Sequence, residues 1–255
     1  MTHALERIVC LSAESADWLW RLGAWDQVVG LTAFFEPAAG AAPKPRVSGF
    51  SSAKTNEIIR LQPDLVVTFS DVQAALTTEL IQAGLSVLAT NQRTLAEVES
   101  TLALLARTVG RESEGERLLC EFRRELAPVP LRTARPRVYF EEWNDPLITG
   151  IAWVSELIER AGGEDIFADR RSERSAGGRV VSPEQVLARR PDLILASWCG
   201  KPVNVEAIAA RAGWESITAV QGRLIREIPG ADILQPGFRL VAGYDRLKRL
   251  ITEVQ

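Results

Sequence analysis

Residues 57–67 read EIIRLQPDLVV, and residues 184–195 read EQVLARRPDLIL. Each segment begins with a glutamate at the head of a helical pattern, passes a Pro-Asp pair and enters an apolar run, which is the order of a helix followed by a buried strand. The proline lies six positions after the glutamate in the first copy and seven positions after it in the second. The repeated order predicts two similar halves, although a helix, a Pro-Asp turn and a strand are also a common α/β combination.

Short apolar segments alternate with helical patterns on both sides of these two copies. In the first half, strands are expected at 7–11, 28–32, 65–69 and 86–89, and helices at 13–22, 56–61 and 77–83. In the second half, strands are expected at 137–142, 193–197 and 224–228, and helices at 154–161, 182–190, 205–212 and 238–254. This alternation with short loops is typical of parallel sheets covered by helices.

A long helical pattern without a strand separates the halves, with apolar residues recurring every three or four positions between Leu95 and Val109. The sequence therefore predicts an α/β fold of two Rossmann-like lobes, each a small parallel sheet flanked by helices, joined by one long α-helix. The expected boundaries are 1–93 for the N-terminal lobe, 94–127 for the connecting helix, and 128–255 for the C-terminal lobe with its closing helix.

Composition excludes several classes of partner. The 255 residues carry a formal net charge of −3, so there is no strongly basic surface of the kind that binds nucleic acid. No apolar run approaches the length of a membrane span, and we expect a monomer with no membrane insertion. The first residues lack the basic start and apolar run of a signal peptide, which predicts a cytoplasmic protein, or a periplasmic one if a signal has been removed.

Signatures of catalysis are missing from the sequence. The single histidine, His3, has no recognisable nucleophile partner, and no metal-ligand spacing or G-x-G-x-x-G motif occurs. Cys10, Cys120 and Cys199 are too few and too widely spaced for a disulfide framework or a zinc site, and the roles of Cys10 and Cys199 stay open. We therefore expect no catalytic residues, no metal site and no enzyme activity.

Aromatic residues follow the predicted strands. Ligands of open α/β sheets bind at the carboxyl ends of the strands, where aromatic side chains suit a large, flat, partly apolar ligand. Each ring taken alone is also compatible with ordinary packing. The rings are Phe34, Phe35, Phe69, Trp143 and Trp198, with Phe50 in a nearby loop.

Glu57 and Glu184 occupy the first turn of a predicted helix at matching places in the two halves. One interpretation is a favourable interaction with the helix dipole, which the capping-box pattern beginning at Ser182 supports for Glu184. The other is a pair of exposed acids that dock onto arginines of a partner protein.

The order of several motifs resembles one known family. The stretches are IVCLSAES (8–15), VSGF (47–50), NEIIRLQPDLVV (56–67), EWNDPLITG (142–150), AGGEDIF (161–167) and VSPEQVL (181–187). Together they resemble the class III, helical-backbone substrate-binding proteins of ATP-driven (ABC) importers for cobalamin, iron-siderophores and haem, and most closely the cobalamin-binding branch. The resemblance covers nearly the whole chain and depends on order and spacing, since no single motif is diagnostic.

This resemblance implies that a cobalamin-type corrinoid is held non-covalently between the lobes. It implies that the ring lies against Phe35, Phe50, Phe69 and Trp143, to which the strand-end argument adds Trp198, with Glu14 and Asp232 as polar neighbours. It also implies that Glu57 and Glu184 pair with arginines of an ABC permease.

Three alternatives remain open. The first is an iron-siderophore or haem protein, which would require arginines facing the ligand, and the available ones are Arg171, Arg174, Arg179 and Arg239. The second is a cytosolic corrinoid carrier that is not coupled to transport. The third is an enzyme of tetrapyrrole metabolism such as a metal chelatase, for which His3 is a poor starting point.

Overall fold

The computed structural model describes residues 5–37, 39–130 and 133–254. The chain forms two compact units. The first comprises Met1–Gln92 and Ala96–Phe122, and the second comprises Arg93–Leu95 and Arg123–Gln255.

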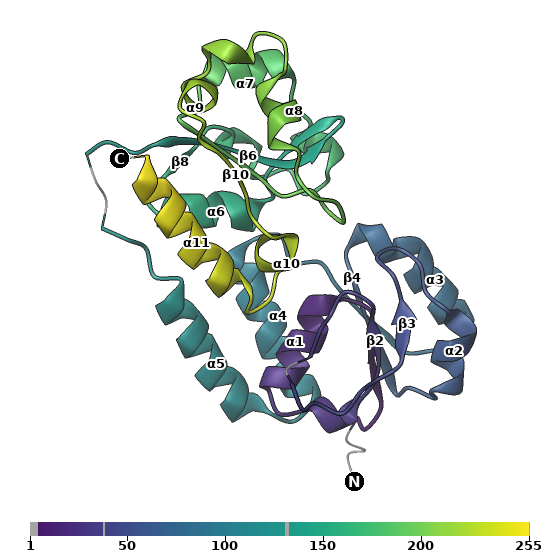
Figure 1. Cartoon of the computed structure of the whole chain (residues 1–255). Coiled ribbons are helices and arrows are strands. Elements are labelled where there is room, and N and C mark those ends of the chain that lie inside the picture. Colours follow the sequence, from purple (N-terminus) through teal and green to yellow (C-terminus); the bar gives the residue numbers. More distant parts are fainter. Residues whose placement is uncertain (1–4, 38, 131–132, 255) are drawn as a thin grey trace. The chain divides into compact units, whose positions relative to one another are not determined.

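The first unit contains a five-stranded, fully parallel sheet (Figure 1). Its strand order reverses between β1 and β4, so the chain winds outward in both directions from the middle of the sheet. Such a switch point leaves a crevice at the carboxyl ends of the two central strands. In spatial order the strands are β3 (Arg46–Ser48), β2 (Val28–Thr32), β1 (Ile8–Cys10), β4 (Leu65–Phe69) and β5 (Val87–Thr90).

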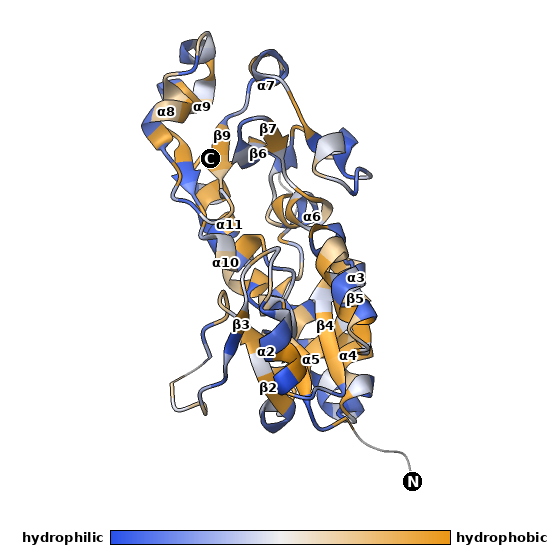
Figure 2. Cartoon of the chain, turned by 90° about the vertical axis from the view of Figure 1, so that its right-hand side faces the viewer, coloured by the Kyte–Doolittle hydropathy of each residue, from blue (hydrophilic) through white to orange (hydrophobic). Residues whose placement is uncertain are grey.

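Helices cover both faces of this sheet. In Figure 1, α1 (Ala13–Arg21) lies on one face, and α2 (Thr55–Arg60) and α3 (Ala74–Gln82) lie on the other. All three residues of β1 are buried because neighbouring strands and helices surround it, and Figure 2 shows the hydrophobic character of β2 and β4. Apolar residues of α2 and α3 pack with those of β1, β3 and β4: Val9, Val47, Ile58, Val66, Leu76 and Leu80.

The helical region between the halves departs from the sequence prediction. It forms two helices, α4 (Leu95–Thr108) and α5 (Glu112–Glu125), so the prediction of one long helix over 94–127 is wrong. Gly110 takes a left-handed conformation with φ +67°, which ends α4, and the apolar spacing that continues past it conceals this break. A Cβ on Gly115 would lie 2.4 Å from the Cβ of Ala106, so α5 packs very closely against the end of α4.

The second unit contains a mixed sheet. Its longest strand, β6, pairs in parallel with β9 and β8 and antiparallel with β7, and this β6–β7 hairpin was not predicted. Strand β10 extends the sheet in parallel beyond β9. The strands are β6 (Arg137–Asn144), β7 (Leu147–Thr149), β8 (Glu164–Asp165), β9 (Leu193–Ala196) and β10 (Ile225–Glu227).

Helices again lie on both faces of the second sheet. Figure 1 shows α7 (Pro183–Arg189), α8 (Val205–Ala209) and α9 (Thr218–Gln221) on one side, and α6 (Ala152–Arg160) and α11 (Leu240–Glu253) on the other. The short helix α10 (Gly230–Ile233) packs against α11. Short 3-10 turns lie at Trp25–Gln27, Asp71–Gln73, Ala168–Arg170, Gly177–Arg179 and Trp214–Ser216.

The core of the second unit centres on three large aromatic residues. Tyr139 packs edge-to-face on Phe167 and on Trp214, with ring centroids 5.8 and 6.1 Å apart. Two parallel-dominated sheets flanked by helices confirm the predicted α/β fold class. Among the residues that the structure describes, no helix is both long and apolar enough to cross a bilayer.

Candidate functional site

At the switch point of the first sheet, Gln73 joins three segments. Its side-chain NH2 donates to the carbonyl oxygens of Leu11 at 2.9 Å and Phe50 at 2.8 Å, while its side-chain oxygen accepts from the backbone N–H of Phe69 at 2.9 Å. Gln73 itself is buried. It therefore fixes the Phe50 loop against the carboxyl ends of β1 and β4, where the predicted ligand residue Phe69 is half-buried.

Two exposed phenylalanines stand at this edge. The rings of Phe34 and Phe50 are each 51% exposed and meet edge-to-face with centroids 6.3 Å apart. Phe35, the residue that the resemblance implied as a ligand contact, is buried against Trp25 at a centroid distance of 6.0 Å. The Phe34–Phe50 pair thus forms an exposed apolar surface that a ligand can contact, whereas Phe35 belongs to the core.

Glu14 lies in the first turn of α1, directly after β1, and is 5% exposed. Burial raises the pKa of its carboxyl to about 7, an effect that the Ser12 hydroxyl partly offsets. Its Oε1 atom is buried and has no hydrogen-bond partner among the residues that the structure describes. A carboxyl in this state can act as a hydrogen-bond donor near neutral pH, which an ordinary surface glutamate cannot do.

In the second unit, a buried ion pair fixes the indole of Trp198. Its indole N–H donates to Glu141 Oε1 at 3.0 Å, and Arg211 holds the same carboxylate with Nη1–Oε2 at 2.5 Å and Nη2–Oε1 at 2.9 Å. Glu141 is fully buried within β6, opposite Ala196 at the carboxyl end of β9. Trp198 is 7% exposed, so its ring offers little surface to a ligand and mainly supports the residues packed against it.

Trp143 lies near the end of β6 and is half-buried, and its indole N–H donates to the Asp145 carbonyl at 2.9 Å. The ammonium of Lys201 lies 4.0 Å from the centroid of Trp143 and 5.1 Å from that of Trp198. Lys201 also donates to the side-chain oxygen of Asn144 at 2.7 Å. The two predicted tryptophans are therefore brought together through one lysine.

Two further polar residues of the second unit, Arg179 and Asp232, are already paired. Arg179, which is 3% exposed, holds Glu142 at 2.5 Å and donates to the Thr149 carbonyl at 2.6 Å. Asp232, the predicted polar ligand contact, accepts from Arg239 at 2.6 Å.

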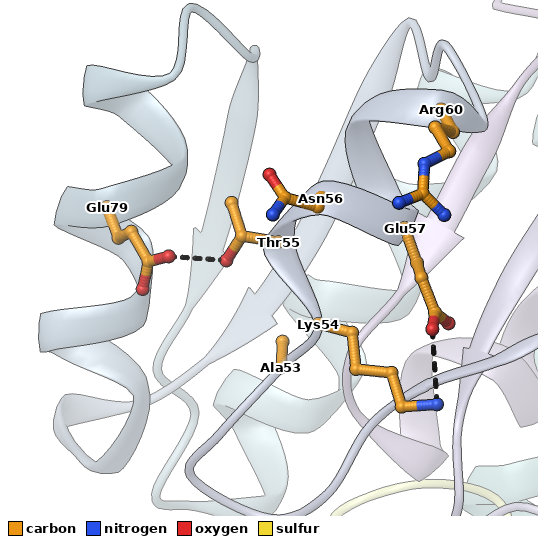
Figure 3. Close-up of a pocket in the computed structure, with 7 residues that line it drawn as sticks. All are labelled: Ala53, Lys54, Thr55, Asn56, Glu57, Arg60 and Glu79. Carbon is orange, nitrogen blue, oxygen red and sulfur yellow. Dashed lines mark hydrogen bonds and ion pairs between the residues drawn. The ribbon is translucent and has the colours of Figure 1, made fainter.

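The two candidate docking acids differ in their surroundings. Glu57 borders a surface depression of about 400 Å³, in which its carboxylate lies 3.3 Å from the Lys54 ammonium and Thr55 donates to Glu79 at 2.6 Å (Figure 3). Glu184 is exposed at the start of α7, where the predicted capping box is confirmed, and hydrogen bonding from Ser182 lowers the pKa of its carboxyl. Both acids lie in the first turn of a helix, as predicted.

Metal and thiol chemistry find little support. In the described part of the chain, no three His, Cys, Asp or Glu side chains gather as metal ligands, and His3 lies outside the described residues. Burial raises the pKa of the Cys10 thiol to about 12, and it also raises the pKa of Cys199. Both thiols therefore stay protonated near neutral pH and are poor metal ligands in that form.

Sequence reasoning missed four residues that shape these edges: Gln73, Glu141, Lys201 and Arg211. Glu141 directly follows the apolar residues Val138–Phe140 of β6 and is the first of two adjacent glutamates. A carboxylate in a buried strand requires a cationic partner, which is a usable signal. The other three lie in loops or turns and become relevant only through contacts with distant residues.

The two α/β units, each with aromatic and polar side chains at the carboxyl ends of its strands, define a ligand-binding protein of the two-lobed α/β type. A family model described as "Periplasmic binding protein" matches residues 8–231, and the chain belongs to this family. Members are binding proteins, and the resemblance found in the sequence is confirmed.

Relatives with assigned names support this placement. The vitamin B12-binding protein of Vibrio parahaemolyticus is 27% identical over 199 residues, which cover 76% of this chain and 71% of that protein. A cobalamin-binding protein of Halobacterium salinarum is 30% identical over 199 residues, covering 74% of this chain and 53% of that protein. The crystal structure of the periplasmic vitamin B12 binding protein BtuF of Vibrio cholerae matches with a TM-score of 0.73 and 22% identity over 98% of both chains, which shows a shared fold.

Proposed function

We propose that this protein binds a cobalamin-type corrinoid reversibly and performs no chemistry on it. The observation that carries the proposal is the alignment of about three quarters of the chain with relatives named for vitamin B12 or cobalamin. The exposed Phe34–Phe50 pair and Trp143 supply apolar faces of the kind that a flat macrocycle buries.

Titration of the purified protein with cyanocobalamin tests the proposal directly. We expect saturable heat in calorimetry and quenching of tryptophan fluorescence at the same stoichiometry. Haem and a ferric siderophore are titrated in parallel. Saturable binding of either of these, with no response to cyanocobalamin, contradicts the corrinoid assignment.

Variants identify the surface involved. Replacing both Phe34 and Phe50 by alanine removes two exposed rings and is expected to weaken cyanocobalamin binding at least tenfold. Ile81→Ala is the matched control, because Ile81 is also apolar and 59% exposed but lies near the end of α3. Equal effects of the two changes argue against a role for the phenylalanine pair.

The arginines required for an anionic siderophore are largely occupied. Arg171 pairs with Glu159 at 2.8 Å, Arg179 with Glu142 at 2.5 Å and Arg239 with Asp232 at 2.6 Å. Binding a polyanionic ligand through these groups would first require breaking ion pairs. This favours the corrinoid over the siderophore alternative.

We also propose that delivery to an ABC importer uses Glu57 and Glu184, one acid in each unit. The carboxylate of Glu57 forms a partly exposed ion pair with Lys54, which costs little to exchange for a pair with a partner's arginine. The predicted cytoplasmic location, which would favour a carrier role, is tested by fractionating cells that produce the protein.

A further inference from the structure

Lys201 occupies an unusual position at the carboxyl edge of the second sheet. Its ammonium lies over the face of Trp143 at 4.0 Å and near that of Trp198 at 5.1 Å, and it donates to Asn144 Oδ1 at 2.7 Å. Both rings are oriented by their own indole N–H bonds, to the Asp145 carbonyl and to Glu141. The ammonium therefore lies against two rings whose orientations are already fixed by hydrogen bonds.

Every group that holds the Lys201 ammonium is neutral. Within the described residues, Lys201 forms no ion pair with a carboxylate, although its side chain is exposed. Lys248 provides the contrast, because it also lies over an aromatic ring, that of Tyr244 at 4.8 Å, but pairs with Asp245 at 2.8 Å. The positive charge of Lys201 is thus left available to an anion.

The same lysine also covers the aromatic face that a flat ligand would use. A ring that stacks on that face of Trp143 has to displace the ammonium, which then loses its cation–π contact. A charge-assisted bond to an anionic group of the ligand offsets this loss. The contact with Asn144 shows that the ammonium can be held beside the tryptophan by a polar acceptor.

Resting on the proposed function, we propose that Lys201 is the specificity-determining residue for the phosphodiester of the corrinoid's nucleotide tail. The ammonium leaves Trp143 when the macrocycle stacks and pairs with the phosphate oxygens. Corrinoids that lack the phosphodiester gain nothing from the lysine. The site therefore favours complete cobalamins over shortened corrinoids.

The test compares two ligands that share the macrocycle. Cyanocobalamin carries the phosphodiester and dicyanocobinamide does not. Lys201→Met keeps most of the apolar stem and removes the charge. In calorimetry we expect this variant to lose about tenfold in affinity for cyanocobalamin, together with most of the salt dependence of that binding, and to bind dicyanocobinamide no more weakly than the unchanged protein does.

Two further variants complete the experiment. Lys201→Arg retains the charge and is expected to retain the preference for cyanocobalamin, while Lys248→Met removes a ring-stacked lysine that already has a carboxylate partner and should change neither affinity. Equal weakening of both ligands by Lys201→Met, or of neither, overturns the role of Lys201 while leaving corrinoid binding in place. If the unchanged protein binds neither ligand, the proposed function fails and the inference fails with it.

Discussion

Glu14 is expected to make the stability of this protein depend on pH across the neutral range. In the folded chain, burial raises the pKa of its carboxyl from 4.5 to about 7. The unfolded chain releases this proton near pH 4.5, so between the two values the folded state holds one proton more than the unfolded state. The free energy of unfolding therefore falls as the pH rises through this window.

The size of the effect follows from the two pKa values. Each pH unit inside the window lowers the stability by about 1.4 kcal/mol, and the full difference corresponds to about 3 kcal/mol, present below pH 4.5 and lost above pH 7. Glu14→Gln replaces the protonated acid by a neutral group of nearly the same shape. The variant should exceed the stability of the unchanged protein by about 1 kcal/mol at pH 5 and by about 3 kcal/mol at pH 8.

Urea unfolding followed by tryptophan fluorescence at half-unit steps from pH 5 to 8 measures this difference. Glu184→Gln is the control, because Glu184 also lies in the first turn of a helix but is exposed and has a lowered pKa. It should leave the slope between pH 5 and 8 unchanged. A constant difference between Glu14→Gln and the unchanged protein over the whole range would refute the account of a buried, protonated carboxyl.

Three other expectations concern the clamp that Gln73 forms through its hydrogen bonds to Leu11, Phe50 and Phe69, the break between α4 and α5, and the two docking acids. Gln73→Leu leaves two carbonyls and one N–H without their partner and should cost about 3 kcal/mol in urea unfolding, and a loss below about 1 kcal/mol would contradict the clamp. Gly115→Val forces a side chain into the Cβ of Ala106 and should lower the melting temperature by several degrees, so an unchanged value would refute the close packing of α4 and α5. Reversing the charges of Glu57 and Glu184 to lysine should lower cellular cobalamin uptake at least tenfold without changing ligand affinity, and unchanged uptake would argue against docking through these acids.

The strands were the most predictable part of the fold. Most of the expected strands occur within one or two residues of their predicted bounds, because buried β-branched runs between turn residues have few other uses. The three-residue strands β3 and β7 and the two-residue strand β8 were missed. Segments this short carry too little periodicity to be distinguished from loops.

The break at Gly110 shows where local patterns mislead. Apolar spacing is the same in one helix and in two consecutive helices that pack on one core. An isolated glycine inside such a pattern is tolerated, at a cost of about 1 kcal/mol relative to alanine, or it can cap the end of a helix. Only the left-handed conformation of Gly110 decides between the two outcomes, and that conformation depends on the packing of α5.

The sequence predicted which edge of each sheet carries the candidate site, but not every side chain that is exposed there. The strand-end rule led to Phe69 and Trp143, which lie toward the carboxyl ends of β4 and β6, while Phe50 was placed in a nearby loop. It could not decide which of two adjacent phenylalanines faces outward, and the structure exposes Phe34 and buries Phe35. The direction of a side chain just beyond a strand depends on the turn that follows, which the residue types alone do not specify.

The clamp formed by Gln73 has a consequence for how fast a ligand can bind. An exposed ring on a loose loop would have to be immobilised during each encounter, at a cost in conformational entropy. Phe50 instead has its backbone held to a buried amide that is itself bonded to the central strands. The ring is therefore presented in a fixed place before the ligand arrives, so the association rate of the unchanged protein should be limited by diffusion and orientation, with no slower step of loop ordering.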